Sequence, residues 1–242
     1  MASDLEGKRC LIIGASSGIG AAVAARFGEM GVRLVVHCNG NREGAEAVAA
    51  GIAAKGGTAS VLQGDVSDGA VAGRDILVNN AGSMFGRVAI ADATDEQYRS
   101  VVDLNIGGVF FASRRAAALM RGARSGTIIN TTSVAARSGG GEGAGLYGSA
   151  KAFVSTITRV LAKELAPSGV RVNAVAPGVI ATPFHERFST PAQLEAAARA
   201  IPLGRVGTPE ECVGAYEFLA SERMSGYITG QIIEVNGGQL MP

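Results

Sequence analysis

The sequence contains no tryptophan, only two histidines and only three cysteines among 242 residues. The cysteines (Cys10, Cys38 and Cys212) are odd in number and far apart. They therefore offer neither a disulfide framework nor the closely spaced ligands of a zinc site. We expect three reduced thiols. Because His37 and His185 are also isolated in the sequence, we expect no metal site.

The sequence also lacks an excess of charge and a long apolar run. It has 22 Lys and Arg residues against 21 Asp and Glu residues, a formal net charge of +1, which gives no electrostatic reason to expect nucleic acid or a membrane surface as a partner. No run approaches the ~18 apolar residues of a transmembrane helix. Residues Met1 to Lys8 mix acidic and basic side chains, unlike a secretory signal. These absences predict a cytoplasmic protein.

Glycine and apolar residues are abundant instead, with 35 glycines and 47% hydrophobic residues. Short apolar runs alternate with longer helical patterns, which is typical of parallel strands covered by helices on both faces. The expected strands are Cys10–Ile13, Arg33–Val36, Ala59–Leu62, Ile76–Val78, Thr127–Ile129, Val170–Val175 and Gln231–Val235. The expected helices are Ile19–Met30, Arg42–Lys55, Asp95–Arg121, Tyr147–Ala166 and Pro209–Ser221. The pattern predicts an α/β fold in one domain (1–242): a doubly wound, seven-stranded parallel Rossmann-type sheet that binds ligands beyond the carboxyl ends of its strands.

One connection does not fit this pattern. Only eight residues separate Asp65-Val66 from Asp75-Ile76, whereas a parallel crossover normally needs a dozen or more. Either the crossover is a stub or residues are missing from the sequence. We favour missing residues, because the loss of a helix would uncover one face of the sheet.

A glycine-rich loop joins the first expected strand to the first expected helix. It reads Gly14-Ala-Ser16-Ser17-Gly18-Ile19-Gly20. Glycines let the backbone turn tightly and approach a pyrophosphate, and the helix N-terminus adds unpaired N–H groups. Glycine triplets are weak evidence in a glycine-rich chain, but the position between strand and helix favours a dinucleotide site over a plain turn.

The end of the second expected strand bears on the choice of cofactor. An acidic residue at this position would bind the adenosine ribose of NAD, but no acid occurs between Val36 and Arg42. Asn39, Asn41, Arg42 and Ser17 could instead contact a 2′-phosphate, with Arg42 supplying charge. Alternatively, Arg42 only opens the next helix and faces solvent. We therefore expect NADP(H) to be favoured, with NAD(H) as the alternative.

Tyr147 and Lys151 begin another expected helix. Residues four apart lie on one helical face, so this pair can share an electrostatic environment. The pKa of a free tyrosine is near ~10, and a nearby ammonium group and an oxidised nicotinamide would both favour the phenolate. Tyr147 is thus a candidate for acid–base chemistry, although Y-x-x-x-K alone is common by chance.

Ser133 and Asn105 complete the candidate set. Ser133 follows the fifth expected strand, where a hydroxyl group can bond a substrate oxygen as charge develops. Asn105 lies within a predicted helix, although asparagine is unfavourable there. It could hold a water molecule that connects Lys151 to solvent, or its side chain could bond its own helix backbone.

Together these motifs resemble the short-chain dehydrogenase/reductase family in its shorter, single-domain branch, and most of all its 3-oxoacyl-acyl-carrier-protein reductases. The matching segments run in family order along nearly the whole chain. They are Gly14-x-x-x-Gly18-Ile19-Gly20, Asn79-Asn80-Ala81-Gly82, Asn105, Ser133, Tyr147-x-x-x-Lys151, Arg171-Val-Asn173, Pro177-Gly178 and Val235-Asn-Gly-Gly238.

The resemblance implies specific roles. Tyr147 would be the general acid/base, Ser133 would orient the carbonyl, and Lys151 would bind the nicotinamide ribose and depress the tyrosine pKa, with Asn105 completing a proton relay. Further residues would hold the cofactor: Asp65 and Val66 at the adenine, Asn79, Asn80, Ala81 and Gly82 along the central channel, and Pro177, Gly178, Val179 and Thr182 at the nicotinamide.

Two local features depart from the family pattern. Ile13 stands where the family often has threonine, so one turn hydrogen bond is lost or supplied elsewhere. The loop from Ser138 to Gly145 is unusually rich in glycine and would border the substrate. Substrate choice should lie in residues 181–206, a candidate lid. There His185, Glu186 and Arg187 contact a polar substrate or form a solvated face.

The resemblance implies an oxidoreductase that exchanges a hydride with a small carbonyl or secondary-alcohol substrate. The reading as a 3-oxoacyl reductase competes with that of a sugar or polyol dehydrogenase, and outside enzymes with a silent dinucleotide-binding regulator. The intact catalytic set argues against silence. Family members are usually homotetramers or homodimers, and Val109-Phe110-Phe111 and Phe153-Val154 fit an interface or plain core equally well.

Overall fold

The computed structural model describes residues 3–64 and 75–241. Within them a single sheet of seven parallel strands has the order β3-β2-β1-β4-β5-β6-β7. The strands are β1 (Arg9–Ile13), β2 (Arg33–Cys38), β3 (Thr58–Gln63), β4 (Ile76–Asn79), β5 (Gly126–Thr131), β6 (Val170–Pro177) and β7 (Ile232–Val235). The predicted strands and the doubly wound parallel architecture are confirmed.

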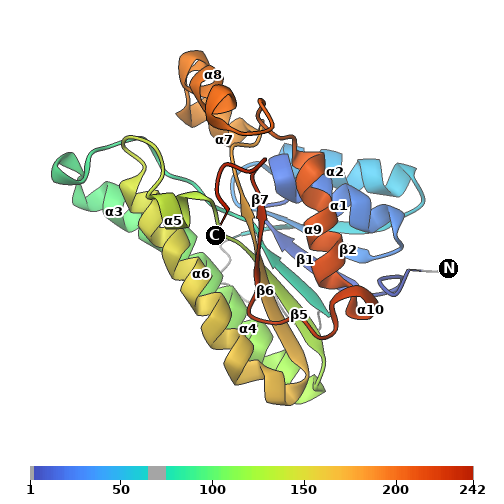
Figure 1. Ribbon diagram of the computed structural model, residues 1–242. Helices are drawn as coiled ribbons and strands as arrows, with labels where there is room; N and C mark the ends of the chain where they lie inside the picture. Colours follow the sequence, from blue (N-terminus) through green and yellow to red (C-terminus); the bar gives the residue numbers. More distant parts are fainter. Residues whose placement is uncertain (1–2, 65–74, 242) are drawn as a thin grey trace.

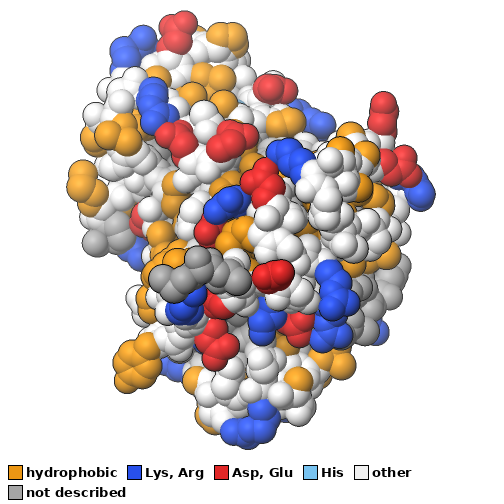
Figure 2. Space-filling view, turned by 90° about the vertical axis from the view of Figure 1, so that its right-hand side faces the viewer, with side chains coloured by type: hydrophobic (Ala, Val, Ile, Leu, Met, Phe, Trp, Pro, Cys, Tyr) orange, Lys and Arg blue, Asp and Glu red, His pale blue; other side chains and the backbone are white. Residues whose placement is uncertain are grey.

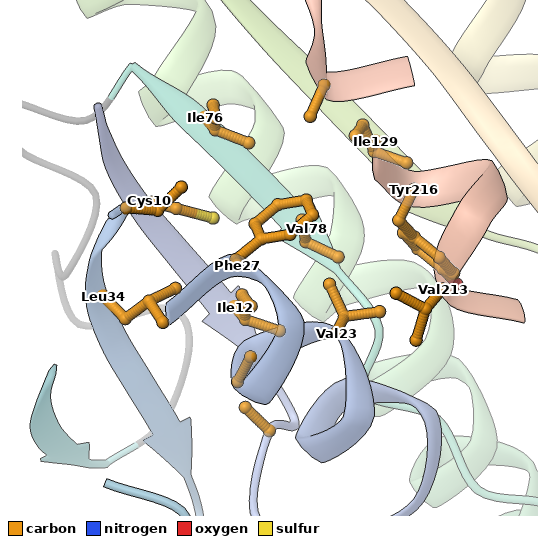
Figure 3. Close-up of a cluster of buried hydrophobic side chains, with 14 of the residues drawn as sticks. Cys10, Ile12, Val23, Phe27, Leu34, Ile76, Val78, Ile129, Val213 and Tyr216 are labelled. Atoms are coloured by element: carbon orange, nitrogen blue, oxygen red, sulfur yellow. The ribbon is translucent and has the colours of Figure 1, made fainter. Parts of the chain in front are cut away.

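Helices cover the sheet on both faces (Figure 1). One face carries α1 (Gly18–Glu29), α2 (Arg42–Ala54) and α9 (Pro209–Ala220), and the other carries α4 (Gly108–Ala123) and α6 (Gly145–Leu165). Because strand side chains alternate between the two faces, β1 contributes side chains to the hydrophobic core on both sides of the sheet. Ile12 packs beside Phe27 of α1 in the first layer (Figure 3), and Leu11 belongs to the cluster beneath α4 and α6.

The predicted continuous helix Asp95–Arg121 is wrong in its middle. The chain forms α3 (Asp95–Val102), then a π-helical turn (Asp103–Gly107), then α4. Asn105 lies in this turn and donates from Nδ2 to the carbonyl of Val101, 2.9 Å away. A side chain that takes a helix carbonyl competes with the backbone ladder, and π turns are frequent at functional sites.

The order of the strands reverses at β1, which lies between β2 and β4. Ligands of doubly wound sheets bind at such a switch point, beyond the carboxyl ends of the strands. Two further helices, α7 (Pro183–Phe188) and α8 (Pro191–Ala200), stand beyond the sheet at the top of Figure 1. A capping box between Thr190 and Gln193 starts α8. The remaining short elements are α5 (Ala135–Ser138), α10 (Glu222–Ser225), η2 (Ile90–Asp92) and η4 (Ala166–Ser168).

The short crossover between β3 and β4 falls on residues 65–74, outside the described residues, and so do Asp65 and Val66. In the part of the chain that is described, no helix combines the length and apolar character needed to cross a bilayer. On the face shown in Figure 2, Lys and Arg side chains are intermingled with Asp and Glu side chains rather than grouped by sign. The three cysteines are buried and form no disulfide within the described residues.

Candidate active site

A cleft of about 1300 Å³ opens at the carboxyl edge of the sheet. Its walls come from the loops that follow β1, β2, β4, β5 and β6, together with α7 and α8. Small-molecule pockets usually measure about 300–1,000 Å³, so this cleft has the size for a long ligand together with a second, smaller one.

The glycine loop forms the first part of the cleft. Gly14 and Gly18 have φ angles of +76° and +56°, which favour glycine strongly. A Cβ atom on Gly14 would lie 2.7 Å from Cα of Ala81, and one on Gly20 would clash with the carbonyl oxygen of Gly14. Gly20 itself does not line the cleft, unlike Gly14, Ser16, Ser17, Gly18 and Ile19. The loop is therefore kept close to the strand ends by the absence of side chains.

The start of α1 provides donors for an anion. Ser17 is the N-cap residue, with extended backbone and no side-chain capping hydrogen bond. The first N–H groups of a helix have no partner within the helix, and here Ser17, Gly18 and Ile19 at the start of α1 line the cleft. These features fit the pyrophosphate of a dinucleotide.

The loop after β2 forms the far end of the cleft. Asn39 lines it, whereas Arg42 does not. The Arg42 guanidinium donates to Glu46 Oε1 (2.7 Å) and to Gln63 Oε1 (3.4 Å), and its side chain is 61% exposed. Arg42 thus opens α2 and faces solvent, which is the second of the two readings of its sequence context. It stays linked to Asn39 through Gln63, whose Nε2 donates to the Asn39 carbonyl (2.9 Å).

The floor of the cleft follows β4. Asn80 donates from Nδ2 to the Gly14 carbonyl (2.8 Å) and so ties this floor to the glycine loop. Asn79, expected to line the channel with Asn80, Ala81 and Gly82, instead points beneath it. Its Nδ2 donates to Asn130 Oδ1 (2.8 Å) and to Ser113 Oγ (2.9 Å) in the layer under α4 and α6. The side chain of Asn79 is thus placed to support the sheet rather than to touch a ligand.

Ser133, Tyr147 and Lys151 meet in the middle of the cleft and all three line it. Tyr147 and Lys151 lie one turn apart on α6, with Lys151 Nζ 5.6 Å from the centre of the tyrosine ring. Ser133 follows β5 and hydrogen-bonds the phenol of Tyr147. Lys151 Nζ donates to the carbonyl of Thr131, 2.9 Å away, which fixes the ammonium group at the end of β5.

The pKa of Tyr147 departs from the direction predicted for it. Burial raises this pKa to about 12, and the hydrogen bond with Ser133 lowers it only in part. Burial also lowers the pKa of Lys151 to about 8. Both shifts disfavour the charged form, because the low dielectric of the site penalises charge. Burial and the Ser133 hydrogen bond are the causes of the Tyr147 shift, and the lowering of this pKa by Lys151 that the resemblance implied stays a prediction.

Asn105 lies behind this group and does not line the cleft. Besides its bond to Val101, its Nδ2 donates to the Ser83 carbonyl (2.7 Å), and its Oδ1 accepts from the Ser83 backbone N–H (3.3 Å). A Cβ atom on Gly82 would lie 2.9 Å from both Asn105 Oδ1 and Lys151 Nζ. Asn105 therefore bonds its own helix backbone and also reaches the lysine end of the site.

The last residue of β6 and the segment that follows it close the cleft on its other side. Pro177, Gly178, Val179 and Thr182 all line it. A Cβ atom on Gly18 would lie 3.2 Å from Thr182 Cγ2, and one on Gly178 would lie 2.7 Å from Asn236 Cβ. The segment after β6 thus approaches the glycine loop across the cleft.

Sequence reasoning missed two residues that the structure brings to the site. The ring of Phe184 packs 5.3 Å from that of Tyr147, and Arg87 lines the same cleft. Neither belongs to a motif, and no sequence signal indicates which cleft a loop arginine faces. Within residues 3–64 and 75–241, no group of three or more His, Cys, Asp and Glu side chains gathers as a metal site.

Comparison with known proteins gives full-length matches. A family model described as enoyl-(acyl carrier protein) reductase matches residues 14–239. A 3-oxoacyl-[acyl-carrier-protein] reductase of Synechocystis sp. is 39% identical over 249 residues, covering 98% of each chain. A solved NADH-dependent reductase complexed with NAD is 35% identical over the whole of both chains, with a TM-score of 0.87.

A further solved structure, from Agrobacterium tumefaciens and assigned as a 2-deoxy-D-gluconate 3-dehydrogenase, contains bound NADP. It is 33% identical over 97% of each chain, with a TM-score of 0.88. Relatives with this fold thus bind either form of the nicotinamide cofactor.

Proposed function

The chain belongs to the short-chain dehydrogenase/reductase family of NAD(P)-dependent oxidoreductases, and we propose that Tyr147 exchanges the proton in its reaction with a carbonyl or secondary-alcohol substrate. The observation that carries this proposal is the meeting of Ser133, Tyr147 and Lys151 in the cleft that contains the glycine loop. A bound nicotinamide cofactor would supply or accept the hydride.

Each catalytic side chain has a defined task in this proposal. In reduction, the Tyr147 phenol donates its proton to the substrate oxygen, and the Ser133 hydroxyl hydrogen-bonds the same oxygen. The Lys151 ammonium, fixed by the Thr131 carbonyl, holds positive charge beside the phenol and favours its anion after proton transfer. Asn105, braced against Ser83, positions the end of a proton relay behind Lys151.

The test is Tyr147→Phe, with Tyr227→Phe as the matched control on the exposed surface. Turnover of ketones, followed by NADPH absorbance, should be lost in the first variant and kept in the second. NADPH binding, followed by fluorescence, should persist in both, because the phenol acts on the substrate. A fully active Tyr147→Phe enzyme would refute the mechanism, and an inactive wild type that binds NADPH would support a silent regulator.

We propose that this chain prefers NADP(H), with NAD(H) as the alternative. Asn39 and Ser17 line the far end of the cleft, no Asp or Glu occurs there among the described lining residues, and Arg42 lies close by. Arg42 needs only to exchange Glu46 for a 2′-phosphate, since exposed ion pairs are worth about 0–1 kcal/mol. Arg42→Ala should lower the ratio of kcat/KM for NADPH over NADH about tenfold. Arg99→Ala, which breaks the equivalent surface pair with Asp95, should not change this ratio.

For the substrate, we propose a small carbonyl or hydroxyl compound bound under residues 181–206, which act as a lid within a single domain. The 3-oxoacyl reductase and the sugar or polyol dehydrogenase remain the two enzymatic readings, and a panel of oxoacyl thioesters and keto sugars distinguishes them. We also propose a homotetramer or homodimer in the cytoplasm, supported by the exposed apolar side chains Phe110, Phe111 and Val160 on α4 and α6. Light scattering after size exclusion tests the assembly.

A further inference from the structure

Arg87 lies in the loop after β4 and joins this loop to two other segments at the proposed substrate end of the cleft. Its Nε donates to the Phe188 carbonyl (2.7 Å), Nη1 to the Glu142 carbonyl (2.8 Å), and Nη2 to Ser189 Oγ (3.5 Å). These acceptors belong to the C-terminal end of α7 and to the glycine-rich loop 138–145. The guanidinium is therefore fixed in orientation by loops far apart in the sequence.

The charge of Arg87 is not neutralised by these partners, which are two carbonyls and a hydroxyl group. Among the described residues Arg87 has no carboxylate within ion-pair distance, whereas Arg9, Arg26 and Arg205 each pair with one. Glu142 contributes its backbone oxygen and not its carboxylate. Both terminal nitrogens of Arg87 keep a second N–H, so the site retains donors and charge for an anion.

The neighbours of Arg87 leave it open to the cleft. A Cβ atom on Gly141 would meet only Arg87 Nη1, at 3.7 Å, and one on Gly139 would meet nothing within 4 Å. Gly139 and Gly141 therefore place no side chain over the guanidinium. His185 adds a second polar group on the same side: its Nδ1 lies 3.0 Å from Ser189 Oγ, and burial together with the charge of Arg87 lowers its pKa.

An aromatic wall connects this cation to the catalytic tyrosine. The Phe184 ring lies 5.3 Å from that of Tyr147 and 5.1 Å from that of Phe188, whose carbonyl accepts from Arg87. Tyr147, Phe184 and Arg87 all line the cleft, so a ligand there can meet the polar reaction centre, the Phe184 ring and the Arg87 guanidinium. Charge-assisted, bidentate bonds to arginine suit a carboxylate in particular.

We propose that Arg87 is a specificity-determining residue that binds a carboxylate, so that the preferred substrates are small hydroxy or oxo acids whose carboxylate lies several bonds from the carbon that exchanges hydride. This inference rests on the proposed function, because it assumes that the reacting carbon lies at Tyr147. It favours a free acid over a neutral acyl thioester as the substrate class.

The test compares acids with neutral partners of similar shape. The pairs are 4-oxopentanoate with its amide and 5-keto-D-gluconate with L-sorbose, and a short acetoacetyl thioester is added. The wild type should prefer the acid in at least one pair. Arg87→Gln should lower the acid-to-neutral ratio of kcat/KM about ten- to hundredfold, in line with the strength of charge-assisted bonds. Arg87→Lys should restore part of this ratio, and Arg99→Gln, an exposed arginine of α3 that does not line the cleft, should leave it at the wild-type value.

A binding measurement separates this inference from the proposed function. Calorimetry titrates gluconate into the enzyme–NADP⁺ complex, which requires no turnover. If gluconate binds the wild type and binds Arg87→Gln more weakly, the carboxylate site is supported, whether or not the ketones are turned over. If every ketone in the panel is inert, that result counts against the proposed reaction and not against the carboxylate site. The inference is overturned if gluconate does not bind, if the thioester or the neutral partners are preferred, or if Arg87→Gln affects acids and neutral partners equally.

Discussion

Gly82 offers a sharp test of how tightly the lysine end of the site is packed. A Cβ atom at this position would lie 2.9 Å from both Asn105 Oδ1 and Lys151 Nζ, and 3.4 Å from Lys151 Cε. Neither neighbour can retreat freely, since Asn105 is completely buried, Lys151 is 2% exposed, and both are hydrogen-bonded. In Gly82→Ala one of them must therefore shift by several tenths of an ångström.

The expected cost follows from the bond that is disturbed. Displacing the ammonium weakens its hydrogen bond to the Thr131 carbonyl, and bonds to charged groups contribute about 1.5–3 kcal/mol. At about 1.36 kcal/mol per tenfold change in rate, kcat/KM should fall about ten- to hundredfold. The loss should appear in turnover more than in NADPH binding, because Tyr147 depends on the position of Lys151.

The assay is ketone reduction followed by NADPH absorbance, with NADPH affinity and the melting temperature measured on the same samples. Gly51→Ala is the matched control: it lies in α2 and has no atom within 4 Å of the added carbon. It should keep full activity and gain about 0.5–1 kcal/mol of stability. A fully active Gly82→Ala enzyme would show that Lys151 and Asn105 are not held as tightly as the structure has them.

Three further predictions concern charge and buried polar groups. Lys151→Met should raise the free energy of unfolding at pH 7 by about 1–3 kcal/mol while removing activity, because a pKa lowered from 10.5 to about 8 means that the folded state is penalised for holding the proton. Urea denaturation measures the difference in the free energy of unfolding between this variant and the wild type. The stabilisation should be full below pH 8 and should shrink as the pH rises toward 10.5. A variant that is less stable than the wild type at pH 7 contradicts the prediction. The kcat/KM for ketone reduction should fall above about pH 8 as the Lys151 ammonium is lost, and a profile level to pH 10 would exclude a role for its charge. Asn130→Ala should destabilise the fold by about 1–3 kcal/mol, because it removes the partner of Asn79 Nδ2 and of Thr158 Oγ1; Asn41→Ala, which removes an exposed cap of α2, is the comparison, and an equal loss in both would argue against a buried network.

The alternation of apolar runs with helical patterns was enough to predict all seven strands and their parallel arrangement. Hydrophobic periodicity is local, and a short run buried on both faces has few other ways to fold. The same holds for the glycine loop between β1 and α1, and for Tyr147 and Lys151, which share a helix face because of their spacing. The interruption of the helix around Asn105 could not be predicted in the same way, because a π turn leaves no distinct periodicity in the sequence.

What the sequence determined by itself was therefore the order of the elements, the glycine loop between β1 and α1, and the place of Tyr147 and Lys151 on one helix face. Tertiary structure alone decided that Asn79 points under the cleft floor, that Arg42 pairs with Glu46, and that Arg87 and Phe184 line the same cleft as Tyr147. It also set the direction of the pKa of Tyr147. The reason is physical: chain neighbours fix periodicity and spacing, whereas burial, desolvation and contacts between loops depend on segments that meet only when the sheet and its helices have packed.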